Sequence, residues 1–134
     1  MERDKITWRR FLKEGDQYLK AATPKKEKSR FNNEIRYNLL SMSLEGYVMA
    51  ILDFHNSLPD NHTYTDLMNG LEKVITVDKS LKERILKYEN IQSICSIEKY
   101  HTSAPTNEEL DDLDGAIREI KDLAYDAIQP YVEN

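Results

Sequence analysis

The sequence predicts an all-α fold, an up-and-down helical bundle of four to five helices forming one domain over residues 1–134. Three observations support this prediction. Apolar residues recur at three- and four-residue spacings over long stretches, as on one face of a helix. Only four Gly and four Pro interrupt the chain. No segment shows the strict apolar–polar alternation of a half-exposed strand. A chain of this length can bury roughly two-thirds of its unfolded surface, enough for a core without disulfides or metals.

The first two predicted helices span residues 5–22 and 30–57. Pro24 stops the first, and Ser29 is a candidate N-cap of the second. Because the second segment is apolar nearly all round, we expect it to be the central helix, contacted from several sides.

Glu45 and Gly46 interrupt the apolar character of this central segment. A helical glycine costs about 1 kcal/mol relative to alanine, so we expect Gly46 to permit close approach of a neighbouring helix. We expect Glu45 to lie at a helix–helix seam, where a buried carboxylate needs a cationic partner. The candidate partners on later helices are Arg84, Lys87 and Arg118.

A short helix follows over residues 64–75, with Thr63 or Thr65 as its N-cap. Residues 78–97 carry the next apolar stripe, and Asp78 is the predicted cap.

Pro105 marks a loop, after which "TNEELDDLDGAIREIKDLAYDAI" predicts a last long helix. It opens with a capping box, in which Thr106 and Glu109 bond each other's backbone N–H groups.

The net charge of −5 is unevenly distributed. Residues 1–36 hold eleven Lys and Arg against six Asp and Glu, whereas residues 107–134 hold nine acids against two bases. We favour the interpretation that the two ends lie close together and compensate. The alternative is a basic face for RNA or an acidic partner. That alternative is weaker because acids are interleaved with the bases.

The single cysteine, Cys95, lies among apolar neighbours and cannot form an internal disulfide. The charged start "MERDKITWRR" lacks the apolar run of a signal peptide. No segment reaches the ~20 apolar residues that span a bilayer. We therefore expect a cytoplasmic protein that does not bind membranes.

The order of these features resembles the HEPN family of small helical bundles. The shared features are a mid-helix glutamate, Glu45, the segment Thr65-Asp66-Leu67 opening a third helix, the loop "EKYH", and the acidic capping box. The similarity is greatest to short stand-alone members found beside minimal nucleotidyltransferases. The sequence departs from the family where Gly46 and Met49 replace lysines, and where "KYHTSAP" replaces an "R-Y-P" loop.

The resemblance implies a bundle that pairs as a homodimer. Many HEPN proteins are metal-independent ribonucleases whose signature is an arginine, four to six residues, then a histidine. Arginine would stabilise the phosphate charge while histidine transfers a proton. No arginine stands at that spacing before any of the three histidines, His55, His62 and His101. The ribonuclease signature is absent.

Other candidate sites are weaker. A metal site at His55, Asp60 and His62 is less favoured than surface or capping histidines, because Pro59 leaves its geometry undefined. The acids of residues 111–115 lack the ligand spacing of a calcium loop. We predict no metal, no cofactor and no catalytic residue. The candidate groove or ligand-binding residues are Glu45, Lys99, Tyr100 and His101, although a structural role for Glu45 and an ordinary loop for the other three are favoured.

We therefore predict a non-catalytic, HEPN-like interaction or regulatory module. The resemblance implies a minimal nucleotidyltransferase as its partner, in a toxin–antitoxin-like pair. Large aromatic side chains often anchor interfaces, and the candidates on the first two helices are Trp8, Phe11, Tyr18 and Phe31. The alternative is a nucleotide- or RNA-binding, ribonuclease-like enzyme with a rearranged site around Glu45, Tyr100 and His101.

Overall fold

A computed structural model describes residues 2–22, 30–89 and 105–132. Within these ranges the chain forms five helices and no strand. They are α1 (Glu2–Ala21), α2 (Arg30–Phe54), α3 (Tyr64–Val74), α4 (Lys79–Lys87) and α6 (Asn107–Val132). The prediction of an all-α bundle is confirmed.

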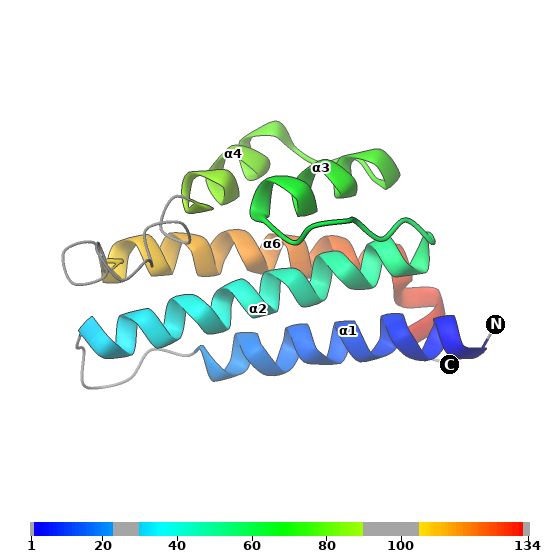
Figure 1. Cartoon of the computed structure of the whole chain (residues 1–134), viewed down its shortest axis with the longest axis horizontal. Coiled ribbons are helices and arrows are strands. Elements are labelled where there is room, and N and C mark those ends of the chain that lie inside the picture. Colours follow the sequence, from blue (N-terminus) through cyan, green and yellow to red (C-terminus); the bar gives the residue numbers. More distant parts are fainter. Residues whose placement is uncertain (1, 23–29, 90–104, 133–134) are drawn as a thin grey trace.

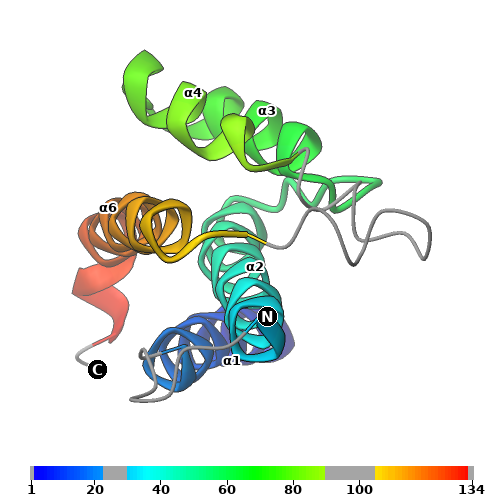
Figure 2. The same ribbon diagram turned by 90° about the vertical axis from the view of Figure 1, so that its left-hand side faces the viewer.

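Helix α2 is the centre of the bundle. It contacts α1, α3 and α6, whereas α4 packs on α3 and α6. Figure 1 shows α1, α2 and α6 running side by side as the long helices, with the shorter α3 and α4 above them. The end-on view in Figure 2 places α2 between α1, α6 and the α3–α4 pair. This position explains why the α2 sequence is apolar nearly all round, as predicted.

Gly46 lets α1 approach α2 closely. A Cβ atom at Gly46 would lie 2.8 Å from the Gly15 nitrogen and 2.9 Å from both the Gly15 Cα and the Phe11 carbonyl oxygen. Gly15 faces α2 in the same way, since a Cβ there would lie 2.8 Å from the Tyr47 ring. These distances are shorter than real Cβ contacts, so a larger residue at either position would force the neighbouring atoms to shift. The predicted close approach at Gly46 is confirmed.

The predicted N-caps of the later helices are present. The Thr63 side chain accepts a hydrogen bond from the Asp66 N–H at 3.1 Å, and Asp78 accepts one from the Ser80 N–H at 3.2 Å. Thr106 and Glu109 bond each other's backbone at 2.9 and 3.1 Å, which forms the capping box.

Two predicted helix ends are wrong. Helix α2 ends at Phe54 rather than at 57, because Asn56 adopts a left-handed φ of 55°. The Ser57 N–H then bonds the Leu52 carbonyl at 2.8 Å, as in a Schellman ending. Helix α4 ends at Lys87, not at 97, because Tyr88 leaves the helical conformation. Residues 90–97 of that predicted helix, which include Cys95, lie outside the described residues, as does Ser29.

Candidate functional site

A hollow lies beside the middle of α2, where the start of α3 packs against it. Its volume is about 370 Å³. Its lining combines one carboxylate with hydroxyl, amide, imidazole and apolar groups, contributed by Asn38, Ser41, Met42, Glu45, His62, Tyr64 and Leu67. We call it the Glu45 hollow.

Glu45 lies at the rim of this hollow, with 46% of its side chain exposed. Its Oε2 atom is 3.4 Å from Nδ1 of His62, in the connector between α2 and α3. The prediction that Glu45 lies at a buried seam is therefore wrong. Successive helical residues point about 100° apart, so when Gly46 faces α1, Glu45 faces away from it.

The three predicted cationic partners of Glu45 make other contacts. Arg84 bonds Asp112 at 3.1 Å and Glu119 at 2.5 Å. Arg118 bonds Asp114 at 2.6 Å, and the Lys87 ammonium lies 5.4 Å from the Tyr88 ring centroid.

The inner wall of the hollow is held by Tyr64, the first residue of α3. The Thr63 cap begins the helix so that the Tyr64 side chain is buried beneath it. The Tyr64 ring lies 6.5 Å from that of Tyr37, and its hydroxyl is 2.5 Å from the Ser41 hydroxyl. Ser41 therefore holds a hydrogen bond across the α2–α3 junction, and its oxygen keeps further capacity to accept one.

Three of the predicted groove residues fall in a part of the chain that the structure does not describe. They are Lys99, Tyr100 and His101.

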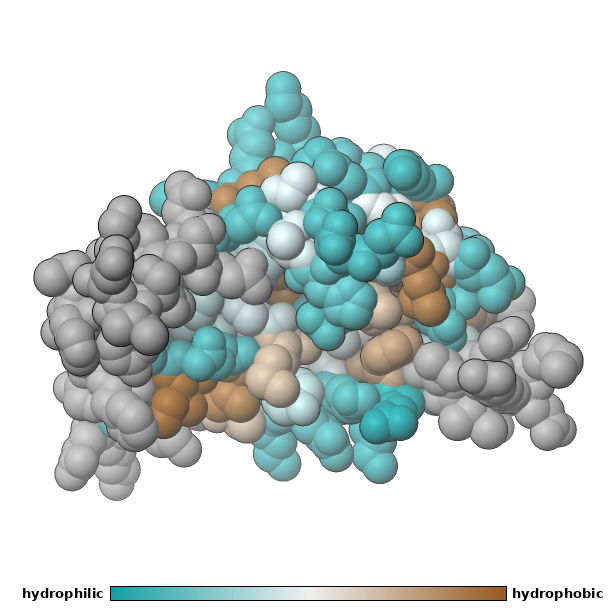
Figure 3. All heavy atoms as spheres, in the orientation of Figure 1, coloured by the Kyte–Doolittle hydropathy of each residue, from teal (hydrophilic) through white to brown (hydrophobic). Residues whose placement is uncertain are grey.

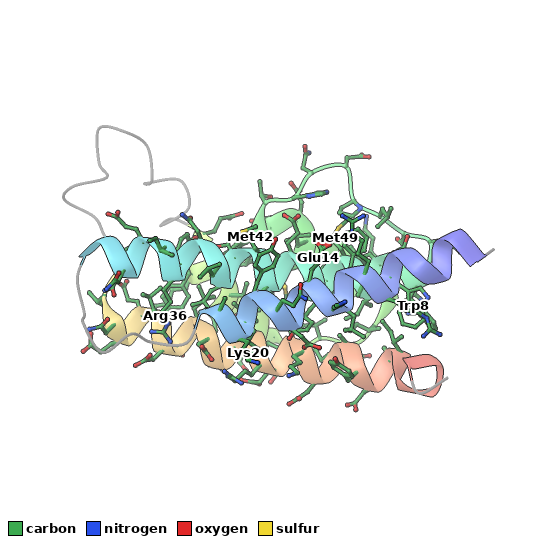
Figure 4. The ribbon with its side chains drawn as sticks, turned by 90° about the horizontal axis from the view of Figure 1, so that it is seen from below. Trp8, Glu14, Lys20, Arg36, Met42 and Met49 are labelled. Carbon is green, nitrogen blue, oxygen red and sulfur yellow. The ribbon has the colours of Figure 1, made fainter. Side chains whose placement is uncertain are left out.

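Trp8, a predicted interface anchor, is only 3% exposed, and its ring packs edge-on against Phe54 at 5.6 Å. It lies near the N-terminal end of α1 (Figure 4). Trp8 is therefore a core residue rather than an interface anchor, because little of its surface is left for a partner to bury.

The remaining interface candidates lie on the first two helices, as expected. Phe11 and Tyr18 are half-buried on α1. Phe31 belongs to α2, but its side chain lies outside the described part of the chain.

Sequence reasoning missed a polar cluster around Asp16 of α1. Both carboxylate oxygens accept tyrosine hydroxyls, from Tyr47 of α2 at 2.5 Å and from Tyr125 of α6. Lys121 lies 3.5 Å away. Burial and the hydrogen bond to Asp16 raise the pKa of Tyr125 to about 12, and the same causes raise the pKa of Tyr47. The cluster holds both hydroxyls protonated and joins three helices, so we assign it a structural role.

A second missed feature is the buried guanidinium of Arg36, which lies between α2 and α6 (Figure 4). Its Nε donates to the carbonyl of Ala22 at the end of α1, at 2.9 Å. Its other nitrogens lie 2.9 Å from Asp111 and 3.5 Å from Asp114. A base of the first 36 residues thus pairs with acids of the last 28, in agreement with the favoured charge interpretation.

The remaining acid of this stretch, Asp112, contacts Tyr88 and Arg84 of the α4 segment. The Tyr88 hydroxyl donates to it at 2.5 Å, and this hydrogen bond, with Arg84, holds the pKa of Asp112 below its usual value. The acids at positions 111, 112 and 114 therefore hold helices together. Among the residues that the structure describes, no group of three or more potential ligands could hold a metal ion.

None of the described helices combines the length and the apolar character that crossing a bilayer requires. No family model, no curated protein and no solved structure matches the chain.

Proposed function

We propose that this chain is a non-catalytic interaction module that self-associates through the uncovered side of α2. The observation that supports this proposal is the placement of two large apolar side chains. Ile35 is 42% exposed and Met42 is 45% exposed, and they lie seven residues apart on one face of the same helix.

Asn38 and Glu45 continue this face at three- and four-residue spacings. We call these four residues the α2 face. Met49, the next residue at a seven-residue spacing, is only 5% exposed, so the apolar surface ends before it. In Figure 3, small groups of hydrophobic residues emerge at several places on a mainly hydrophilic surface. The α2 face alternates apolar and polar side chains, a mixture that is also found in protein contacts.

A second copy of the chain is the partner that we propose for the α2 face. In a two-fold dimer the same face meets itself, so Ile35 of one copy can cover Met42 of the other when the helices cross antiparallel. Methionine side chains adapt to such surfaces because they are unbranched and flexible. The resemblance to HEPN proteins, which usually pair, supports self-association.

The same resemblance supports a minimal nucleotidyltransferase as a further partner of the dimer, in a toxin–antitoxin-like pair. The missing Arg-x4–6-His signature supports a role without ribonuclease activity. These two parts of the proposal rest on the sequence alone.

The mass of the protein in solution tests self-association. We expect wild-type protein to sediment as a dimer and Met42→Glu to sediment as a monomer, because two carboxylates would be buried at the two-fold interface. Leu58→Glu is the matched control: Leu58 is 51% exposed but lies in the connector after α2. It should leave the dimer intact. A monomeric wild type, or equal sedimentation of both variants, would contradict the proposal.

A further inference from the structure

We propose that the Glu45 hollow binds an organic cation, specifically a guanidinium group carried on an alkyl stem. Among the described residues that line the hollow, Glu45 is the only Asp, Glu, Lys or Arg. Its partner there is the His62 imidazole, whose Nδ1 lies 3.4 Å from the Glu45 Oε2 atom. The described lining therefore offers a carboxylate with no Lys or Arg beside it.

Two other hollows in the described part of the chain differ in this respect. One is lined by Asp60 and Asp66 but also by Lys73, and the other places Arg9 and Lys13 beside Asp16. In the first hollow two carboxylates face one lysine, so Lys73 competes with a cationic ligand for them. The second holds more cationic than acidic groups and disfavours a cation. The Glu45 hollow is the one of these three whose described lining holds a carboxylate and no Lys or Arg.

The acceptors in the hollow suit a guanidinium better than an ammonium. The Glu45 carboxylate can accept two parallel N–H bonds, and the Asn38 carbonyl and the Ser41 hydroxyl offer acceptors on the same helix. A guanidinium presents five N–H groups in a planar fork that can reach several such acceptors at once. An ammonium has three donors on one atom.

The apolar part of the lining suits the stem of such a ligand. Met42 and Leu67 provide the aliphatic surface against which the methylene groups of an arginine-like chain can pack. The volume of about 370 Å³ is near the lower limit of ligand sites, which run from about 300 to 1,000 Å³. It therefore fits one side chain or a small amine better than a larger ligand.

Asn38, Met42 and Glu45 line the hollow and also belong to the α2 face, so a bound guanidinium and a second copy of the chain compete for these three residues. The guanidinium has two possible sources: a free small molecule, or an arginine side chain of a bound protein. Both sources share the same chemistry at the hollow.

The test is a titration with N-acetylarginine amide at neutral pH and low salt, followed by NMR of the Met42 methyl group and the His62 ring. We expect saturable shifts at both groups. Glu45→Gln should weaken binding about five-fold, as expected for a half-exposed ion pair. Glu14→Gln is the matched control: it removes the same charge from a partly exposed glutamate on α1, which pairs with Arg10. It should leave the affinity unchanged.

Three outcomes would overturn the inference. They are an absence of saturable shifts, equal weakening by the two substitutions, and equal binding of N-acetylglutamate amide. Retained NMR spectra of both variants exclude unfolding as the cause. A helical peptide with one arginine then separates the sources: tighter binding than the free probe indicates a protein side chain, and equal binding indicates a small molecule.

Discussion

Replacing Gly46 with alanine should destabilise the fold, although alanine is the better helix former. Two effects oppose each other. In a helix interior alanine gains about 1 kcal/mol over glycine. The new Cβ, however, would lie 2.8–2.9 Å from three backbone atoms of α1, at Gly15 and Phe11. Backbone atoms cannot rotate away from the new Cβ as a side chain can, so α1 must move away from α2 where the two helices touch.

Overpacking a core usually costs about 1–3 kcal/mol. We expect a value near the upper limit, about 3 kcal/mol, because all three close atoms belong to the backbone. Subtracting the helix-forming gain leaves a net loss of about 2 kcal/mol. With denaturant slopes of about 1–3 kcal/mol per molar urea, the unfolding midpoint should fall by about 1 M.

Urea unfolding followed by far-ultraviolet circular dichroism measures this loss, with Gly115→Ala as the control. Gly115 lies inside α6, where a Cβ would meet only the end of the Arg84 side chain, at 3.5 Å. This substitution should therefore gain about 1 kcal/mol from helix propensity. The two substitutions are chemically identical, but their effects on the free energy of unfolding should have opposite signs. If Gly46→Ala raised the midpoint as Gly115→Ala does, the close contact of α1 and α2 would be refuted.

Two further predictions concern the missed polar clusters. Arg36→Met should lower the free energy of unfolding by about 1–2 kcal/mol, because the Ala22 carbonyl loses its donor and Asp114 keeps only Arg118 as a cationic partner among the described residues; an unchanged urea midpoint would contradict this role. At high pH, stability should fall as pH rises from 10.0 toward about 12, because Tyr125 loses its proton in the unfolded chain before it does so in the folded one. Unfolding free energies measured across that interval should fall less steeply for Tyr125→Phe, and an identical slope would argue against the Asp16 hydrogen bond.

Local signals predicted most of the helices correctly. The caps at Thr63, Asp78 and Thr106 depend on residues within three positions of each other, so they can be identified from the sequence. The exact ends at Phe54 and Lys87 were missed for different reasons. After Phe54, Asn56 and Pro59 are residues that commonly follow a helix end but do not fix its last residue, whereas Tyr88 and Glu89 after Lys87 are compatible with a helix. A left-handed asparagine at position 56 is permitted by its side chain but not required by it.

The candidate site was harder to predict because its contacts join distant parts of the chain. Whether Glu45 is buried depends on which residue of α2 faces α1. Gly46 is the residue that faces it, which leaves the neighbouring Glu45 partly exposed. The sequence offered Glu45 three cationic partners, but each pairs elsewhere. His62, its actual neighbour, lies in a connector whose course has no periodic signal. Arg36 pairs with Asp111 and Asp114, which lie 75 and 78 residues later in the sequence. At that separation, sequence spacing does not indicate which residues are in contact.

The order of the helices along the chain has a consequence for folding kinetics. α1 and α2 are consecutive, so closing the short segment between them has a low entropic cost. Their seam can form while the rest of the chain is still unfolded. α6 packs against the same central helix only after a loop of more than fifty residues has closed, since it begins at Asn107 and α2 ends at Phe54. We therefore expect the α1–α2 hairpin to be the folding nucleus, on which the C-terminal helix docks late.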